Sequence, residues 1–202
     1  VIAGNVSTSS AAFELITSGA DAIKIGQGPG SVCRTRTVTG NGVPQLTAIM
    51  SIHNDLSDSA QRSKVKLIAD GGIREGGDIV KALAAGADSV MIGGLFAGCE
   101  ETPSLLLCDP THRLFRGSAS SEAQMQWKGR VSVDEGAAGV VENKGSVSNI
   151  VEGLVSGLRS GMSYQGVSNL KDLRDNAVFI RQTHAALLEG HVHHKDLIMK
   201  RQ

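Results

Sequence analysis

One pattern occurs twice in this sequence, as Gly19-Ala20-Asp21-Ala22-Ile23-Lys24-Ile25-Gly26 and again as Gly86-Ala87-Asp88-Ser89-Val90-Met91-Ile92-Gly93. Each copy contains a glycine that ends a helix, a turn, a short apolar strand and a further glycine in a loop. The repetition predicts an internal βα unit. Strands that alternate with helices favour a parallel sheet.

The segments around the two copies continue this alternation. Strands are predicted at residues 1–6 and 65–69, and helices at 10–19, 44–56, 77–85 and 147–158, the last from apolar residues at steps of three and four. We expect that apolar stripe to be core packing. An α/β fold that forms part of a (β/α)8 TIM barrel fits best, with chemistry at the C-terminal ends of the strands. A doubly wound sheet is the alternative.

Composition limits the classes of partner. The 202 residues can form one domain, and 20 basic residues balance 20 acidic ones. Without net charge, there is no global field to recruit nucleic acid or an anionic membrane, so any anion must be bound by a local site. No apolar run approaches the ~18 residues that span a bilayer. These features predict a soluble, cytoplasmic protein that binds neither nucleic acid nor membrane.

The periodicity fails between residues 105 and 145, where polar and small residues dominate and only residues 121–127 suggest a short helix. Such a stretch is typical of a flap outside the core. Nearer the C-terminus, the tract with His191, His193 and His194 has no partner carboxylate at ligand spacing, so a solvated tail is favoured for the last two. Cys99 and Cys108 are expected to be packing residues or surface thiols.

The glycine-rich loop Gly26-Gln27-Gly28-Pro29-Gly30-Ser31-Val32-Cys33-Arg34-Thr35-Arg36 follows a predicted strand. Its carbonyls or amides could face an ion or a phosphate. Positive charge from Arg34 and Arg36 would favour the nucleophilic thiolate of Cys33. A small buried residue is an equally good interpretation of Cys33.

Two further glycine pairs follow strands, in Asp70-Gly71-Gly72 and Gly93-Gly94. An aspartate can hold ribose hydroxyls, and glycine amides can hold a phosphate. Either pair alone could equally serve a left-handed turn, but their equivalent positions in a repeat strengthen the binding hypothesis. Glu135, on a loop, is taken by itself as a solvated charge.

Five motifs together resemble the IMP dehydrogenase/GMP reductase family, and most closely IMP dehydrogenase. They are Gly28-Pro29-Gly30-Ser31-Val32-Cys33, Gly42-Val43-Pro44-Gln45, Ala69-Asp70-Gly71-Gly72-Ile73-Arg74, Gly77-Asp78-Ile79-Val80-Lys81-Ala82-Leu83 and Gly157-Leu158-Arg159-Ser160-Gly161-Met162. The resemblance implies that residues 1–202 are the second half of that family's catalytic TIM barrel, with 105–145 as flap and 183–202 as C-terminal tail. The first half of the barrel and the family's CBS pair are absent from this sequence.

The resemblance implies that the Cys33 thiolate attacks C2 of IMP, that hydride passes to NAD, and that water hydrolyses the covalent intermediate to XMP. Thr35 and Arg130 would help to activate the water. In the flap, however, Arg130-Val131 stands where the family has an Arg-Tyr pair. Two alternatives stay open: GMP reductase, which converts GMP to IMP with NADPH, and a non-catalytic nucleotide-binding paralogue.

The resemblance also implies binding roles. Asp70 would hold the ribose, Glu135 would contact the purine edge, and Gly117 would lie beneath the base. Phosphate would be held by Ser31, Gly72, Gly93 and Gly94, and NAD would meet Asn5, Lys24, Gly26 and Gly28. Potassium would be held by carbonyls of Gly28, Gly30 and Cys33 and by Glu189, Gly190 and His191 of a neighbouring subunit in a homotetramer.

One stretch departs from the family pattern within the expected substrate site. Phe115-Arg116-Gly117-Ser118-Ala119-Ser120 stands where the family has Tyr-Arg-Gly-Met-Gly-Ser. A phosphate-binding hydroxyl and a purine contact are thereby lost. Phe115 is still expected to border the substrate.

Overall fold

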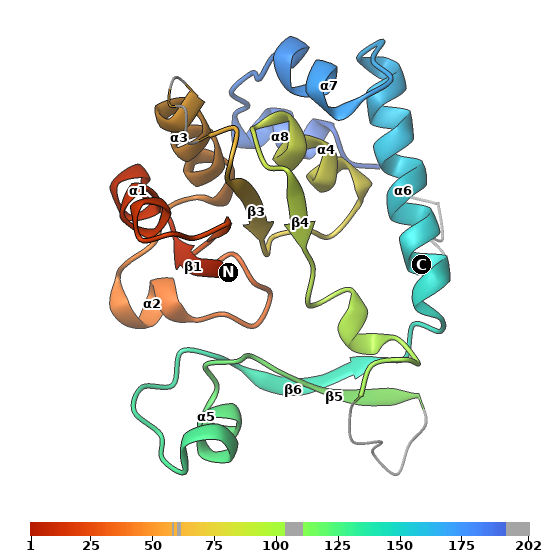
Figure 1. Ribbon diagram of the computed structural model, residues 1–202. Helices are drawn as coiled ribbons and strands as arrows, with labels where there is room; N and C mark the ends of the chain where they lie inside the picture. The colour runs from red at the N-terminus through yellow and green to blue at the C-terminus, as the bar shows by residue number, and fades with distance from the viewer. Residues whose placement is uncertain (58, 60–61, 104–110, 193–202) are drawn as a thin grey trace.

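Four parallel strands form the sheet at the centre of the molecule, in the order β1-β2-β3-β4 (Figure 1). The computed structural model describes residues 1–57, 59, 62–103 and 111–192, so Cys108, His193 and His194 lie outside the described residues. The strands are β1 (Ile2–Val6), β2 (Ala22–Ile25), β3 (Lys66–Asp70) and β4 (Ser89–Met91). β2 and β4 are the strands of the two sequence copies, which confirms the predicted βα repeat.

Helices follow the strands as expected: α1 (Ser9–Thr17) after β1, α3 (Gln45–Ser57) after β2 and α4 (Gly76–Ala84) after β3. Successive strand residues point to opposite faces of a sheet. Ile23 and Leu67 are fully buried in one core with Ile49 and Ile52 of α3. Lys24, between two of the buried strand residues, is only partly buried. One face of the sheet therefore carries the helices, and the other faces the interior that a complete barrel would enclose.

A second core forms where α6 (Val147–Tyr164) and α7 (Leu170–Asn176) pack against α4. The predicted helix at 147–158 is confirmed and continues to Tyr164. Its apolar stripe is only partly core, however. Leu154 is buried against α4, whereas Val151 and Val155 are 41% and 37% exposed. Among the described elements, α6 packs mainly against α4, so residues of the stripe that do not face α4 stay partly exposed.

The stretch 105–145 contains regular structure that the sequence did not indicate. β5 (His112–Arg116) and β6 (Ala138–Glu142) form a two-stranded antiparallel ribbon, and α5 (Ser121–Lys128) confirms the predicted short helix. Only two of the five residues of His112-Arg113-Leu114-Phe115-Arg116 are apolar, which explains why no strand pattern is visible. β3 and β4 point toward this ribbon (Figure 1).

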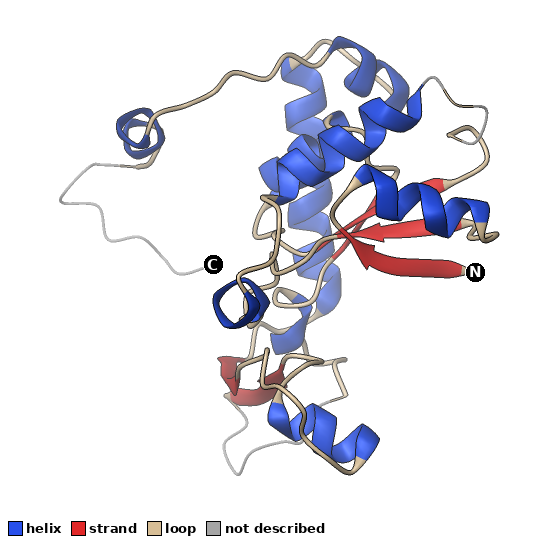
Figure 2. Cartoon of the chain, turned by 90° about the vertical axis from the view of Figure 1, so that its left-hand side faces the viewer, coloured by secondary structure: helices blue, strands red, loops and turns tan. Residues whose placement is uncertain are grey.

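The sheet ends at β1 and β4, and neither outer edge pairs with another strand of the described chain. Ile2 on β1 is 64% exposed and Met91 on β4 is 46% exposed. At the far end, α8 (His184–Glu189) has no buried residue and stands apart on an extended segment (Figure 2). No helix in the described part of the chain combines the length and apolar character needed to cross a membrane.

Candidate active site

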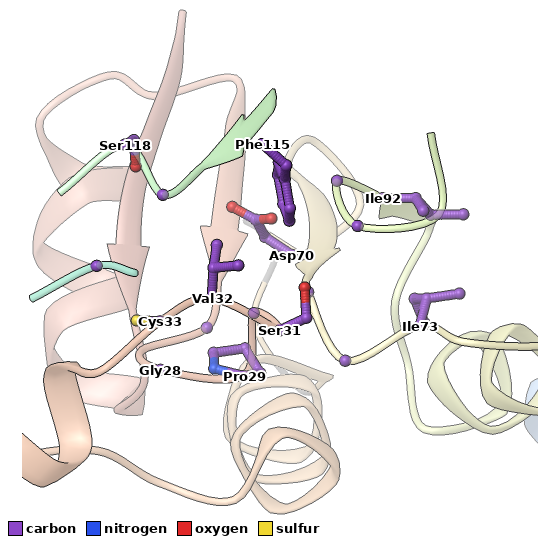
Figure 3. Close-up of a pocket in the computed structure, with 18 of the residues that line it drawn as sticks. Gly28, Pro29, Ser31, Val32, Cys33, Asp70, Ile73, Ile92, Phe115 and Ser118 are labelled. Atoms are coloured by element: carbon purple, nitrogen blue, oxygen red, sulfur yellow. The ribbon is translucent and has the colours of Figure 1, made fainter. Parts of the chain in front are cut away.

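A pocket of about 890 Å³ opens where the loops that follow β1 to β4 meet the β5–β6 ribbon. Cys33 and Ser118 lie toward one end of it, and Ile73 and Ile92 toward the other, with Ser31, Asp70 and Phe115 between them (Figure 3). Thirteen of the residues assigned from the sequence line it: Asn5, Gly26, Gly28, Gly30, Ser31, Cys33, Asp70, Gly72, Gly93, Gly94, Phe115, Gly117 and Glu135. These residues come from distant parts of the chain, so the fold brings them together.

Cys33 is exposed to this pocket and is not part of either hydrophobic core. Its amide donates to the Gly30 carbonyl at 3.1 Å, which closes a turn. Backbone bonds then tie the loop to the ribbon: Ala137 N–H donates to Val32 O at 2.7 Å, and Arg34 N–H donates to Glu135 O at 2.7 Å. Of the two interpretations of Cys33, accessibility supports the nucleophile.

A chain of polar groups leads away from the thiol. The Cys33 Sγ lies 3.3 Å from the Thr35 hydroxyl, which itself donates to Glu135 Oε2 at 2.7 Å. Glu135 is therefore paired with a hydroxyl beside the thiol, rather than being the solvated charge that its loop position suggested. A carboxylate that accepts the proton of a hydroxyl group makes that hydroxyl oxygen better able to take a proton from another molecule. Proton removal of this kind is what general base catalysis requires.

Arg36 shapes the cysteine loop. Its guanidinium donates to Gln27 O at 2.8 Å and to Val43 O at 2.6 Å, so it joins the two ends of the loop. Gly28 and Gly42 adopt φ of +82° and +144°, and a Cβ at either would lie within 2.6 Å of the Arg36 side chain. In the sequence, Arg36 is only a positive charge near Cys33. In the structure, its side chain packs against Gly28 and Gly42 and holds the two ends of the loop together.

Three glycine loops converge in the pocket. A Cβ on Gly94 would lie 2.7 Å from Ser31 Oγ, and one on Gly71 would lie 3.1 Å from the Gly30 amide nitrogen. In the described part of the chain, the backbone amides of Ser31, Gly72, Gly93 and Gly94 donate to no acceptor. Converging free amides form a concavity that suits an anion such as a phosphate.

Asp70 lies at the end of β3 and is held by two donors. Lys24 Nζ and Asn5 Nδ2 each lie 2.9 Å from its Oδ2, which leaves Oδ1 for another partner. Asn5 Nδ2 also donates to Gly26 O at 2.9 Å, so only its amide oxygen stays free for a cofactor. Asp70 can thus accept hydrogen bonds from sugar hydroxyls, while Lys24 does not itself line the pocket.

The loop carbonyls fit a monovalent cation. Gly28 O and Cys33 O accept no hydrogen bond in the described chain, and Gly30 O accepts one from the Cys33 amide. Carbonyl oxygens of this kind can replace the hydration shell of potassium. Glu189, Gly190 and His191 are at the end of α8, which stands away from this loop within the chain (Figure 2).

Two of the residues to which the resemblance assigns catalytic roles lie outside the pocket wall. Thr35 contacts the Cys33 thiol, whereas Arg130 is exposed and is not among the residues that line the pocket. Conversely, Lys144 lines the pocket although sequence analysis gave it no role. No signal in the sequence distinguishes Lys144 from the other lysines, because it follows a strand that no periodicity reveals.

Parallel βα units with an exposed cysteine and free backbone amides at the C-terminal ends of the strands define part of a (β/α)8 barrel, the end where the active sites of such barrels lie. The model of the "IMP dehydrogenase / GMP reductase domain" matches residues 1–193. The chain belongs to this family, whose IMP dehydrogenases are oxidoreductases.

Several named proteins are similar to this chain. An inosine-5'-monophosphate dehydrogenase of Aquifex aeolicus is 48% identical over 96% of the chain and 41% of its own length. One of Borreliella burgdorferi is 43% identical over 96% of the chain and 50% of its own length. A crystal structure of a variant GMP reductase from Trypanosoma brucei in complex with guanosine 5'-monophosphate matches with a TM-score of 0.87. It is 43% identical, and the match covers 95% of this chain and 40% of that one.

The chain thus spans about two fifths to half of the length of these relatives. The expectation that it supplies about half of a TIM barrel is confirmed by the four parallel strands and the structural match. The two open edges of the sheet are where the remaining barrel strands would pair.

Proposed function

We propose that the full-length protein oxidises IMP to XMP with NAD, through a covalent purine intermediate on Cys33. The observation that carries this proposal is the chain of contacts from Cys33 to Thr35 to Glu135, in the same pocket as a set of free amides. A nucleophile and an anion subsite in one pocket suit a substrate that is both electrophilic and phosphorylated.

The chemistry divides into two steps. In the first, the Cys33 thiolate adds to C2 of the purine, and the hydride on C2 passes to NAD, which leaves a thioimidate. In the second, water adds to C2, Thr35 takes a proton from the water while passing its own to Glu135, and the carbon–sulfur bond breaks to return the thiolate. The sum is IMP, NAD⁺ and water converted to XMP, NADH and a proton.

Binding roles follow from position. Asp70, with one oxygen unused by Lys24 and Asn5, accepts from the ribose hydroxyls. The amides of Ser31, Gly72, Gly93 and Gly94 hold the phosphate, and Phe115 and Gly117 border the nucleotide. Asn5, Gly26 and Gly28 line the mouth where the nicotinamide must approach C2. When bound, NAD supplies the hydride acceptor, and potassium on Gly28, Gly30 and Cys33 carbonyls would steady the loop.

The test is turnover by the full-length protein with IMP and NAD. NADH absorbance should rise, Cys33→Ala should abolish the rise, and Cys99→Ala should retain it because Cys99 is 1% exposed in the core beside η1 (Phe96–Gly98). Mass spectrometry should find the purine adduct on Cys33. If wild-type protein binds IMP but yields neither NADH nor adduct, the proposal is wrong.

GMP reductase is the second candidate, favoured by the structural match to a GMP reductase and by the position of Arg130 outside the pocket. Here the thiolate would add to C2 of GMP, and the amino group would leave as ammonia with protons taken from solvent. Hydride supplied by NADPH would then add to C2, and the carbon–sulfur bond would break to return the thiolate and release IMP. No hydrolytic water is needed, so no flap arginine is needed either. Consumption of NADPH with GMP, together with inert IMP, would establish this reaction.

A non-catalytic nucleotide-binding paralogue is the third candidate. It is favoured by the exposed Arg130 and by Phe115, which offers no hydroxyl to the pocket. Tight binding of IMP with no turnover in either direction, and no labelling of Cys33, would identify it.

The assembly that this function needs is also part of the proposal. The missing first half of the barrel must pair with β1 and β4 to close the sheet. The family resemblance adds a homotetramer in the cytoplasm, in which Glu189, Gly190 and His191 reach a neighbouring subunit's potassium. Leu187 and Leu188 of α8 are 51% and 55% exposed, which is consistent with docking on another subunit.

A further inference from the structure

Four basic side chains line the pocket, and three of them have partners in the described chain. Arg36 is bonded to Gln27 and Val43, Arg116 to Gln126, and Arg74 lies 3.7 Å from Asp78. Lys144 is the fourth, and its ammonium forms no ion pair with any described residue. Within the described residues, one pocket cation therefore has no ion-pair partner.

The backbone places Lys144 at the glycine-loop end of the pocket. β6 begins beside the thiol, where Ala137 donates to Val32, and runs away from it. Beyond β6, the Lys144 amide donates to Gly98 O at 2.8 Å. Gly98 ends η1, whose first two amides donate to the Gly93 carbonyl, so one short turn joins the residue that Lys144 contacts to the Gly93–Gly94 loop.

Gly98 permits this close approach. A Cβ there would lie 2.4 Å from Glu142 O and 3.1 Å from the Lys144 Cγ, so the aliphatic stem of the lysine rests on a bare glycine. The stem thus packs against Gly98, and Lys144 lines the pocket. Both the position and the orientation of the charge depend on this contact.

Apart from the basic side chains of the pocket, the donors of the anion subsite are neutral backbone amides. Its amides carry partial charges, Phe115 contributes an apolar ring, and Ile73 and Ile92 add further apolar surface. Hydrogen bonds to a charged group contribute more than neutral ones, and a dianion in partly apolar surroundings needs a counter-charge. The two pocket carboxylates are held elsewhere, Asp70 by Lys24 and Glu135 by Thr35.

We propose that Lys144 is the cation that recognises the phosphate of the nucleotide and makes this site select nucleotides over nucleosides. The inference deepens the proposed function and rests on it for the identity of the nucleotide. It does not depend on turnover, because any purine nucleoside monophosphate seated on the free amides would present its phosphate to Lys144.

The experiment compares the affinities of IMP and its nucleoside inosine, by calorimetry, in full-length protein. Lys144→Met should weaken IMP binding about tenfold or more, the loss expected for one charged hydrogen bond, and should change inosine binding less than about twofold. Lys144→Arg should recover most of the loss. Lys66→Met is the matched control, because Lys66 is exposed at the opposite end of β3 and should leave both affinities unchanged.

Failure of this inference and failure of the proposed function have different signatures. If Lys144→Met loses affinity for IMP and inosine equally, or loses neither, the proposed role of Lys144 is wrong. Formation of NADH by the wild-type protein would in that case still support the dehydrogenase. Loss specific to the nucleotide, in a protein that makes no NADH, would support Lys144 and refute the dehydrogenase. GMP, titrated in parallel, should show the same dependence on Lys144.

Discussion

The hydroxyl of Thr35 donates a 2.7 Å hydrogen bond to the carboxylate of Glu135, a residue 100 positions further along the chain. The same hydroxyl lies 3.3 Å from the Cys33 sulfur. The loop between α5 and β6, which carries Glu135, is therefore part of the candidate active site. A substitution in that loop can alter the environment of the Cys33 thiol through one intervening atom, the Thr35 hydroxyl oxygen.

Thr35→Val should separate the two chemical steps. Without the hydroxyl, the thiolate can still form the intermediate, but the path for the water proton to Glu135 is broken, so hydrolysis should slow about 100-fold. Rapid mixing with IMP and NAD should then show a burst of NADH followed by slow turnover. Thr47→Val, at an exposed position of α3, should behave as wild type. Equal slowing of the burst and of turnover would contradict the relay.

The described cysteines should differ sharply in reactivity. Iodoacetamide should label Cys33, which is exposed, and should spare Cys99, because burial and then the charge of Glu101 raise the pKa of the Cys99 thiol. IMP should protect Cys33 from labelling. Peptide mapping by mass spectrometry after a short exposure measures the labelling of Cys33 relative to Cys99. We expect this ratio to exceed about tenfold. Labelling of Cys99 at the same rate would mean that the core beside η1 opens readily.

Two glycines on α6 should respond in opposite directions to the same substitution. A Cβ on Gly157 would lie 3.0 Å from the Gly76 Cα, where α6 crosses α4, so Gly157→Ala should destabilise the fold by about 1–3 kcal/mol. A Cβ on Gly153 would meet nothing within 4 Å, so Gly153→Ala should stabilise by about 0.5–1 kcal/mol through helix propensity. Urea unfolding of full-length protein measures both. Identical effects would mean that the α4–α6 contact is not close.

Acid should destabilise the fold through a polar cluster at the opposite end of the strands from the pocket. Burial, and then the nearby Arg62 and Arg174, lower the pKa of His53, whose Nδ1 accepts from Arg62 at 3.3 Å. A histidine whose folded-state pKa is depressed takes up protons more readily when unfolded. Stability should therefore fall as the pH drops below the unfolded value of about 6.5.

His53→Asn keeps an acceptor for Arg62 but cannot titrate, so it should flatten the fall in unfolding free energy between neutral and mildly acidic pH. His184→Asn, at an exposed position of α8, should leave the profile unchanged. Protonation of Asp88 should lower the free energy of unfolding further, at a lower pH than His53 does. Burial opposes its ionisation, but the Leu67 amide and Arg62 outweigh burial and hold its pKa below the ordinary value. An unchanged slope in His53→Asn would exclude His53 as the source.

Local patterns in the sequence determined the elements of the barrel. The repeated Gly-Ala-Asp unit, the apolar runs and the glycine stops located β2, β4 and the helices after the strands, because turn preference and periodicity act over a few residues. The loop that carries Cys33 and the glycine pairs after β3 and β4 account for about half of the residues that line the pocket. Parallel strands bring such loops to one edge whatever their separation in the chain.

Tertiary structure alone decided which partner each polar group meets. The ribbon of β5 and β6 has no periodic signature, so the pairing of Glu135 with Thr35 and the position of Lys144 over Gly98 could not be derived from spacing. Exposure of Val151 and Val155 likewise depends on which face of α6 packs against α4. Sequence fixes what a residue prefers within its own turn or strand; contacts across many residues are fixed only when the elements pack.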